Sequence, residues 1–348
     1  MEIHVVKVLF FSTLAFIAAF SLTPLLTHFL YKYKLGKKIR DNGNTPIFSK
    51  LHAHKDGTPT MGGILVWGTL LILIVTFAVL DDLLVGDLWS SLNFLSRSET
   101  LLPLGTLIIT ALIGLFDDWL DVRGKGVLGG GGLKVWHRLI IYTLIATAGA
   151  LWFYFKLDWG VFHLPFFGNF EIGAWYIPVF IFIIVATSFS VNESDGLDGL
   201  AGGSLLIAFA AYGVIAFSLG RYDLATFCGV IIGALLAFLW FNIPPARFYM
   251  GDTGAMSLGV TLGVIAMLTN YSPLLLFIGI VFVLESLSVI LQLLSKKIRK
   301  RKLIISSPVH NHFQAIGWPE AKVVMRFWVV SGIGAAVGLI IFMLDRNF

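Results

Sequence analysis

Residues 5–31, VVKVLFFSTLAFIAAFSLTPLLTHFLY, form a nearly continuous apolar run at the start of the chain. The run is longer than a signal-peptide core of roughly 7–15 residues, and no clear small-residue cleavage site follows it. About 20 mainly apolar residues are enough for a helix to cross the hydrocarbon core of a membrane. The sequence therefore predicts that this segment is a retained transmembrane helix.

The same length criterion, applied along the chain, predicts an all-α polytopic membrane protein with about ten transmembrane helices. The expected spans are 7–30, 62–80, 100–116, 137–156, 172–191, 201–219, 224–241, 256–271, 273–294 and 324–344. Composition agrees, because 57% of residues are hydrophobic and 13% charged, against roughly 25% charged in soluble domains. We expect a single membrane domain over residues 1–348.

The basic residues are concentrated in alternate loops. Of 25 lysines and arginines, 19 fall in the segments 31–60, 117–138, 242–255 and 295–323. Loops rich in lysine and arginine stay in the cytoplasm, so these loops are expected there and both termini on the extracytoplasmic side. The net charge of +5 would otherwise suggest a nucleic-acid partner, but charges confined to short loops of a membrane protein exclude that interpretation.

The polar clusters fall in five loops of the same predicted side: 31–61, 117–137, 192–200, 242–255 and 295–323. Asp117 and Asp118 end a span, where two carboxylates at the negative end of a helix dipole are unfavourable without a cation. Further carboxylates stand beside glycines, which let backbone N–H groups approach an anion. Carboxylates together with phosphate oxygens suit Mg²⁺. A solvated helix end and ordinary Asp-Gly turns are the alternative interpretations.

Two histidines, His310 and His312, flank Asn311 in a loop that contains no cysteine. This pattern favours phosphate contact or proton transfer over a zinc site, with structural hydrogen bonding as the alternative. Within the spans, Glu285 and Gln292 are polar residues that should face the interior of the bundle or a cavity. The run 296–302 is rich in lysine and arginine and would attract anionic lipid.

Five short motifs occur in a fixed order along the chain. They are Lys55–Gly63 (KDGTPTMGG), Phe116–Asp118 (FDD), Asp195–Ala201 (DGLDGLA), Phe248–Gly254 (FYMGDTG) and Ser307–Phe313 (SPVHNHF). Together they resemble the phospho-N-acetylmuramoyl-pentapeptide transferases of the polyprenyl-phosphate N-acetylhexosamine-1-phosphate transferase superfamily. The resemblance extends over essentially the whole chain.

The resemblance implies a reaction, its substrates and a location. Phospho-MurNAc-pentapeptide would pass from UDP-MurNAc-pentapeptide to undecaprenyl phosphate, with Mg²⁺ required, and the products would be lipid I and UMP. This is a step of peptidoglycan biosynthesis. The protein would be a homodimer in contact with membrane lipid in the bacterial cytoplasmic (inner) membrane, with its active site facing the cytoplasm.

The resemblance also assigns roles to individual residues. Asp252 would be the metal ligand, and Asp117, Asp118 and His310 would form the catalytic group. The nucleotide- and substrate-binding residues would be Lys55, Thr60, Asn192, Asp195, Asp198, Asn242, Tyr249, Gly251, Gln292, Asn311 and His312. An Asp would remove a proton from the lipid phosphate, or would attack first and form a phospho-enzyme; the sequence leaves both open.

This chain departs from the family pattern at three places. Asn311 replaces the middle residue of a triple histidine, and Glu193-Ser194 replaces a Leu-Thr pair, which adds negative charge. In the loop 121–138 a glycine run replaces part of a lysine-containing stretch, so the resemblance assigns functional roles to Lys125 and Lys134 only weakly. A sister transferase for GlcNAc-1-phosphate remains an alternative. A secondary transporter is disfavoured, because its key charges would lie near the bilayer midplane.

Overall fold

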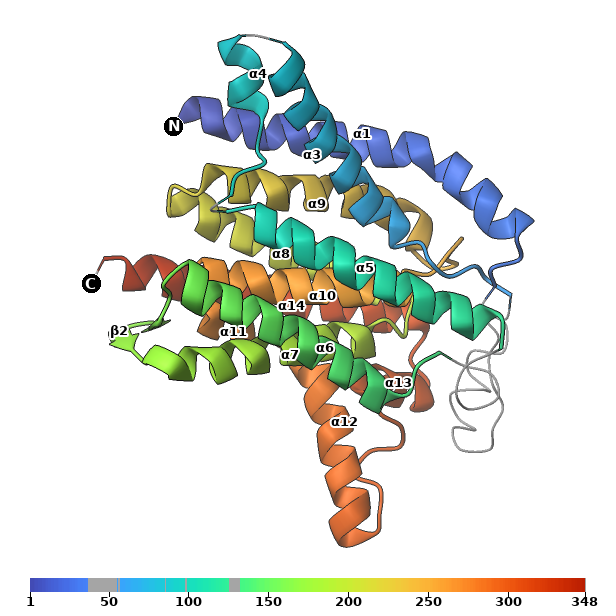
Figure 1. Ribbon diagram of the computed structural model, residues 1–348. Helices are drawn as coiled ribbons and strands as arrows, with labels where there is room; N and C mark the ends of the chain where they lie inside the picture. The colour runs from blue at the N-terminus through green and yellow to red at the C-terminus, as the bar shows by residue number, and fades with distance from the viewer. Residues whose placement is uncertain (37–54, 56, 85, 98, 125–131, 348) are drawn as a thin grey trace.

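The structure is a computed structural model that describes residues 1–36, 55, 57–84, 86–97, 99–124 and 132–347. Within these ranges nine helices are long and apolar enough to cross a membrane, and one bent pair of helices raises the number to at most ten. The predicted all-α polytopic fold is therefore confirmed. Both chain ends lie at the same end of the bundle (Figure 1).

Nine long helices make up most of the bundle. They are α1 (Glu2–Lys32), α3 (Ile64–Leu83), α5 (Leu101–Val122), α6 (Val135–Leu151, continued by a π-helix over Trp152–Lys156), α7 (Tyr176–Ser194, after a 3-10 turn over Gly173–Trp175), α8 (Leu200–Ser218), α9 (Tyr222–Asn242), α10 (Gly251–Leu268) and α14 (Glu320–Asp345). The short helices outside the bent pair are α4 (Asp87–Leu92) and α13 (Val309–Ala315). The bent pair begins with a 3-10 turn over Ser272–Leu274 that continues into α11 (Leu275–Ile278), and its second half is α12 (Ile280–Arg299).

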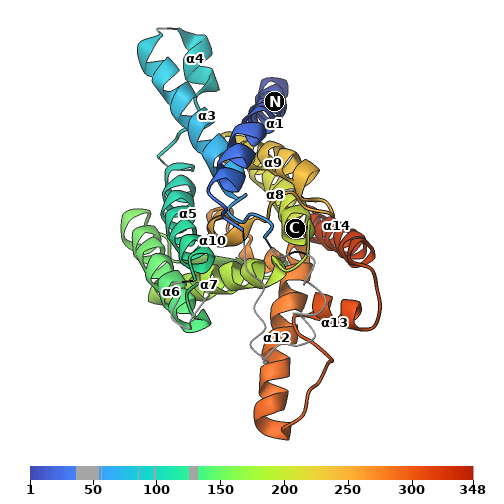
Figure 2. The same cartoon turned by 90° about the vertical axis from the view of Figure 1, so that its right-hand side faces the viewer.

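Helix α10 lies at the centre of the bundle, between α5, α7 and α8 (Figure 2). Its most apolar window is 94% buried. The glycines of α10 explain its central position, because they let neighbouring backbones approach closely. A Cβ at Gly259 would lie 2.9 Å from Cα of Ser188, and one at Gly254 would lie 2.9 Å from Cα of Gly63. The site is built around the first turn of this helix.

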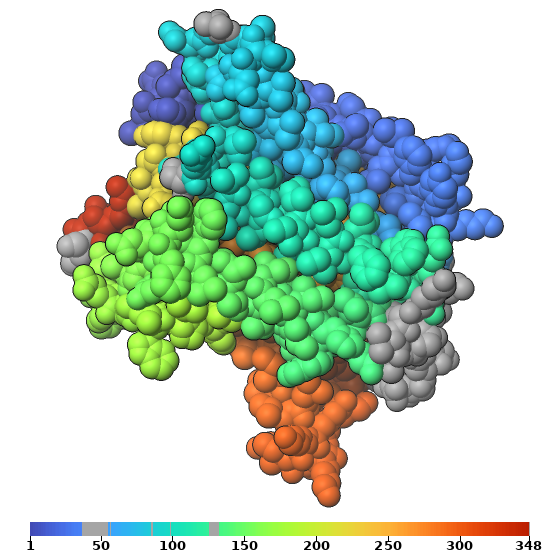
Figure 3. Space-filling view, viewed as in Figure 1, coloured from blue at the N-terminus to red at the C-terminus, as the bar shows by residue number. Residues whose placement is uncertain are grey.

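The ninth predicted span, 273–294, is not one straight helix. It is broken at Gly279, where α11 and α12 meet at an angle of 84°. A Cβ at Gly279 would lie 2.9 Å from the carbonyl oxygen of Leu275. The backbone at the break is therefore too close to Leu275 for a residue larger than glycine. Helix α12 consequently projects away from the bundle (Figures 1 and 3). One side of α12 is buried, including Glu285 and Gln292, while many of its leucines are exposed.

A small antiparallel hairpin, which the sequence did not predict, joins α6 to α7. It consists of β1 (Val161–Leu164) and β2 (Gly168–Glu171), with Val161 paired to Glu171. Asp345, at the end of α14, anchors it: its carboxylate lies 2.7 Å from the His163 ring and accepts the backbone N–H of Phe166 at 2.6 Å. The hairpin lies at the end of the bundle that carries the chain termini (Figure 1).

Candidate active site

Asp117 and Asp118 are both buried near the end of α5, but they make different contacts. Consecutive residues on an α-helix point about 100° apart. The Asp118 carboxylate accepts the backbone N–H groups of Asp252 at 3.1 Å and Thr253 at 3.0 Å, and the Thr60 hydroxyl at 3.2 Å. It therefore caps the first turn of α10, where a negative charge is stabilised by the helix dipole.

Asp117 instead joins an ionic cluster drawn from four helices. Its carboxylate accepts from Nε of Arg138 at 2.8 Å, and Nη2 of Arg138 donates to Asp252 at 2.7 Å. Nη1 of the same guanidinium donates to the Asn192 side-chain oxygen at 2.9 Å, and the Asn192 amide donates to Asp252 at 2.6 Å. Asp117, Arg138, Asn192 and Asp252 come from α5, α6, α7 and α10; we call them the carboxylate–arginine cluster.

Two glycines bring backbone close to these carboxylates. A Cβ at Gly132 would lie 2.0 Å from Oδ1 of Asp117, the oxygen that accepts the backbone N–H of Leu133. Gly251 has φ +72°, and a Cβ there would meet Asp118 and Thr60 at 2.5 Å. Any larger residue at either position would displace a carboxylate. The Gly251 N–H also donates to Asp195 at 3.1 Å, which places Asp195 beside the cluster.

A second group of charges, around Lys55, holds three loops together. Lys55 donates to Asp198 at 2.6 Å and to Glu320 at the start of α14. Asp198 also accepts the backbone N–H of Ala246 at 3.0 Å. The Tyr249 hydroxyl donates to the Lys55 carbonyl at 3.4 Å. Burial raises the pKa of the Tyr249 phenol well above its usual range, and the neighbouring carboxylates act in the same direction, so the phenol stays protonated.

Asn242 connects two of the predicted site loops through its side-chain amide. Its oxygen accepts the backbone N–H of Gly199 at 2.9 Å, and its nitrogen donates to the carbonyl of Phe248 at 2.8 Å. The side chain is 4% exposed. Asn242 therefore fixes the spacing between the DGLDG loop and the loop that leads into α10.

His310 presents one ring nitrogen without a protein partner. Its Nδ1 lies 3.0 Å from Oε2 of Glu285, and its Nε2 has no hydrogen-bond partner among the residues that the structure describes. Both side chains are at most 1% exposed. A Cβ at Gly196 would lie 2.4 Å from Nε2, so the free nitrogen faces the DGLDG loop. Glu285 thus has a partner within the bundle, as expected for a charge in a span.

The remaining predicted residues of this region differ in their contacts. The Asn311 side-chain oxygen and Nδ1 of His312 have no partner in the described part of the chain. Gln292, in contrast, uses its whole amide: it accepts from the backbone of Leu303 at 2.8 Å and Ile304 at 3.1 Å and donates to the Ile304 carbonyl at 2.9 Å. Gln292 therefore fixes the loop that precedes α13, and its hydrogen bonds reach no other predicted site residue.

Sequence reasoning missed Arg138, Glu320 and the pairing of Glu285 with His310. The sequence analysis counted Arg138 only among the basic residues of its loop. It assigned a role weakly to Lys134, whose side chain is exposed in the structure. A basic residue in the first turn of a helix opposes the helix dipole, and that conflict was the available signal for Arg138. Lys125, with 125–131, and residues 37–54 and 56 of the first loop lie outside the described ranges.

An apolar groove of about 760 Å³ lies along α7, α11 and α12. Phe182, Phe282 and Leu287 are among the residues that line it, and it extends from Phe162 of the hairpin to Ile290. Ser190 and Ser286, hydrogen-bonded at 2.6 Å, also line it. They stand two residues before Asn192 and one after Glu285, so the groove reaches the level of the carboxylate–arginine cluster.

The fold and this charged site define a membrane-embedded transferase: the model of glycosyl transferase family 4 matches residues 100–270. The phospho-N-acetylmuramoyl-pentapeptide-transferase signature 1 matches residues 55–65. Relatives with the name phospho-N-acetylmuramoyl-pentapeptide-transferase include one from Chloroflexus aggregans, 39% identical over 92% of this chain and 87% of the relative. One from a Geobacillus species is 40% identical over 94% and 95% of the two chains. The chain therefore belongs to the phospho-N-acetylmuramoyl-pentapeptide-transferase family.

Proposed function

We propose that the protein transfers phospho-MurNAc-pentapeptide from its UDP carrier to undecaprenyl phosphate, with Mg²⁺ as cofactor, and forms lipid I and UMP. The observation that carries the proposal is the carboxylate–arginine cluster beside the apolar groove. The cluster offers carboxylates for a divalent cation that binds the diphosphate, and the groove has the apolar lining that a polyprenyl chain requires. The names of the relatives support the same substrates.

The donor set fits Mg²⁺ once substrate phosphates are included. No group of three or more His, Cys, Asp or Glu side chains in the described ranges is arranged to hold a metal ion. Mg²⁺ needs only one or two protein carboxylates when phosphate oxygens and water complete its coordination. Asp252, with Asp117 beside it, would hold the ion, because both carboxylates already share one cation, Arg138. When bound, the ion would neutralise the diphosphate and the leaving UMP.

The protein side chains then position the reaction. An oxygen of the lipid phosphate forms a bond to the phosphorus that carries the sugar, and the bond from that phosphorus to the bridging oxygen breaks, so UMP leaves with the bridging oxygen. Asp117 accepts the proton of the lipid phosphate, because Asp118 is engaged as the cap of α10. Nε2 of His310 contacts a phosphate oxygen, and Glu285 holds the imidazole in place. Lys55 and Tyr249 line the nucleotide side.

Charge placement supports the location. Loops rich in lysine and arginine stay on the cytoplasmic side, which favours a cluster at the cytoplasmic face, and the bacterial relatives support the inner membrane. UDP-linked substrate reaches this face from water, and the lipid phosphate stays at the membrane surface. The family resemblance adds a homodimer to the proposal.

The experiment is an assay of purified protein with UDP-MurNAc-pentapeptide or UDP-GlcNAc, undecaprenyl phosphate and a titration of Mg²⁺. We expect UMP release with the pentapeptide substrate only, and loss of UMP release on chelation of Mg²⁺. Turnover of UDP-GlcNAc, but not of the pentapeptide substrate, would assign the protein to the sister transferases. Repeated turnover to UMP without lipid phosphate would contradict transfer, whereas a single equivalent of UMP would indicate a phospho-enzyme.

A further inference from the structure

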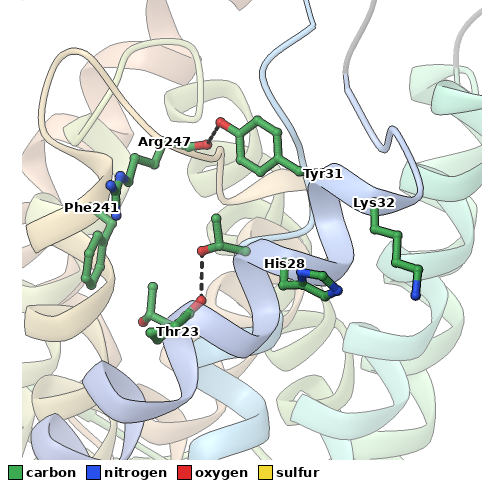
Figure 4. Close-up of a pocket in the computed structure, with 8 residues that line it drawn as sticks. Thr23, His28, Tyr31, Lys32, Phe241 and Arg247 are labelled. Atoms are coloured by element: carbon green, nitrogen blue, oxygen red, sulfur yellow. Dashed lines mark hydrogen bonds between the residues drawn. The ribbon is translucent and has the colours of Figure 1, made fainter.

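Two buried hydroxyl groups, on Tyr142 of α6 and Ser188 of α7, have no hydrogen-bond partner among the residues that the structure describes. Tyr142 is 1% exposed and Ser188 is 0% exposed. The Tyr31 hydroxyl, which lines a pocket of about 500 Å³ at the end of α1, instead donates to the Arg247 carbonyl at 3.0 Å (Figure 4). A buried polar group without a partner is costly in free energy, so the pair on α6 and α7 calls for a functional explanation.

The pair lies one helical turn below the carboxylate–arginine cluster. Tyr142 stands four residues after Arg138 on α6, and Ser188 stands four residues before Asn192 on α7. Residues four apart share one face of a helix. Helices α6 and α7 run antiparallel, and Arg138 donates to Asn192 at 2.9 Å. The next turn therefore brings the two hydroxyls to the same level, on the faces that carry the cluster.

The Tyr142 hydroxyl is within electrostatic reach of the proposed metal ligand. Among the charged groups, the Asp252 carboxylate acts on this hydroxyl most strongly, followed by the Arg138 guanidinium. One turn farther from the cluster, Ala146 and Ile184 are buried and apolar. The Tyr142 hydroxyl therefore has the charged cluster on one side and an apolar helix interface on the other.

Asp252 would need a further hydrogen-bond donor if Mg²⁺ took the place of Arg138. Its Oδ1 accepts from the Asn192 amide at 2.6 Å and its Oδ2 from Arg138 at 2.7 Å. A carboxylate that binds a metal is itself commonly held by hydrogen bonds from the surrounding protein. Tyr142 is a donor of this kind, because its hydroxyl is not engaged by another described residue.

We propose that Tyr142 is a positioning residue of the metal site. Its hydroxyl donates to Asp252 when Mg²⁺ occupies the place of Arg138, and the Ser188 hydroxyl, which faces the phenol, donates to the phenol oxygen and orients it. The inference rests on the proposed function, because it requires the metal ion of the transfer reaction. It extends the site by one turn into the bundle, beyond the five motif-containing loops.

The test is a Mg²⁺ titration of the purified full chain, measured as apparent Tm without substrate and, in parallel, as UMP release. The matched control for Tyr142→Phe is Tyr176→Phe. Tyr176 is 0% exposed and its hydroxyl also lacks a partner in the described ranges, but it begins α7, at the end opposite Asn192. Y142F should need about tenfold more Mg²⁺ for half of the full Tm shift, as expected for loss of a group that holds a metal ligand. Y176F should respond as the wild type does.

The kinetic measurement separates metal binding from catalysis. Y142F should raise the Mg²⁺ concentration for half-maximal UMP release by a larger factor than it lowers kcat at saturating Mg²⁺. Ser188→Ala should raise that concentration by a smaller factor, and the double variant should shift it no farther than Y142F, because Ser188 acts through the phenol. Loss of a hydroxyl without a partner should leave the apparent Tm in the absence of Mg²⁺ unchanged. If Y142F does not fold, S188A carries the same test.

Equal Mg²⁺ midpoints for Y142F and the wild type would overturn the proposal. Equal shifts of the midpoint in Y142F and Y176F would do the same, because an effect common to both hydroxyls reflects general packing. A wild type whose apparent Tm does not respond to Mg²⁺ would also contradict it. If the midpoints of the Tm shift separate as expected but no protein releases UMP, the proposed reaction fails while the role of Tyr142 at the metal site stands.

Discussion

The guanidinium of Arg138 lies 2.7 Å from Oδ2 of Asp252, the residue predicted to bind the metal. The same guanidinium also pairs with Asp117, so one internal cation balances two carboxylates. A divalent ion bound between those carboxylates would take over the role of Arg138. If the metal binds there as proposed, the arginine would compete with it in the resting site; without the metal, the arginine is the counter-ion that keeps the two carboxylates together.

Replacing Arg138 with Gln tests this competition directly. The two carboxylates would then lack a cationic partner, and breaking a buried ion pair on one side costs roughly 3–5 kcal/mol in the free energy of unfolding. Mg²⁺ should raise the apparent Tm of R138Q more than that of the wild type, because no arginine has to be displaced. The exposed neighbour Lys134→Gln is the control and should respond as the wild type does. Equal Mg²⁺-induced shifts in all three proteins would show that the metal binds elsewhere.

The variants Asp117→Asn and Asp252→Asn should each lower kcat for UMP release by roughly 10²–10³-fold, the usual effect of removing a group that stabilises transition-state charge. The change keeps the size of the side chain, and in each variant Arg138 retains Asn192 and the other carboxylate as partners, so both proteins should remain folded in detergent, as measured by apparent Tm. Asp82→Asn removes a carboxylate from the exposed end of α3 and should be fully active. Near-normal kcat in either site variant removes that aspartate from its proposed role.

Asp118→Asn should act on stability more than Asp117→Asn does. The Asp118 carboxylate accepts two backbone N–H groups of α10 through its two oxygens, and the single oxygen of asparagine cannot replace both. Hydrogen bonds to a charged group contribute about 1.5–3 kcal/mol each. Asp117 also accepts through both oxygens, but its donor Arg138 keeps Asn192 and Asp252 as acceptors when Asp117 is changed. We therefore expect a lower apparent Tm for D118N than for D117N. If D118N keeps the wild-type Tm but loses UMP release, Asp118 acts in the chemistry and not as a cap.

Local composition was enough to predict the spans, because a membrane helix is set by its length and apolarity alone. The break at Gly279 was not predictable in this way, since the residues on both sides of it are apolar and mean hydropathy stays high across the bend. The hairpin was missed for a related reason, because its strands are short and it depends on Asp345, far along the chain.

The motifs selected loops that the structure brings together, but they did not separate the contacts within that group. Asp117 and Asp118 are adjacent and chemically identical, and only the three-dimensional position of α10 distinguishes a cap from a member of the ionic cluster. Lys55 and Glu320 are 265 positions apart, so no local pattern connects them. Arg138 was overlooked because a topology argument counts every basic loop residue alike.

The pairing of Glu285 with His310 yields a prediction about how two residues act together. Glu285 contacts Nδ1 of the imidazole, and Nε2 is the nitrogen proposed to contact the phosphate, so Glu285→Gln should lower kcat through His310. His310→Gln should lower kcat more, and the double variant should be no slower than His310→Gln by itself. Effects of residues that act as a unit are not additive. The double-mutant cycle is measured as UMP release, with apparent Tm recorded for each protein. Losses that multiply instead would show that Glu285 acts independently of the histidine, through the placement of α12.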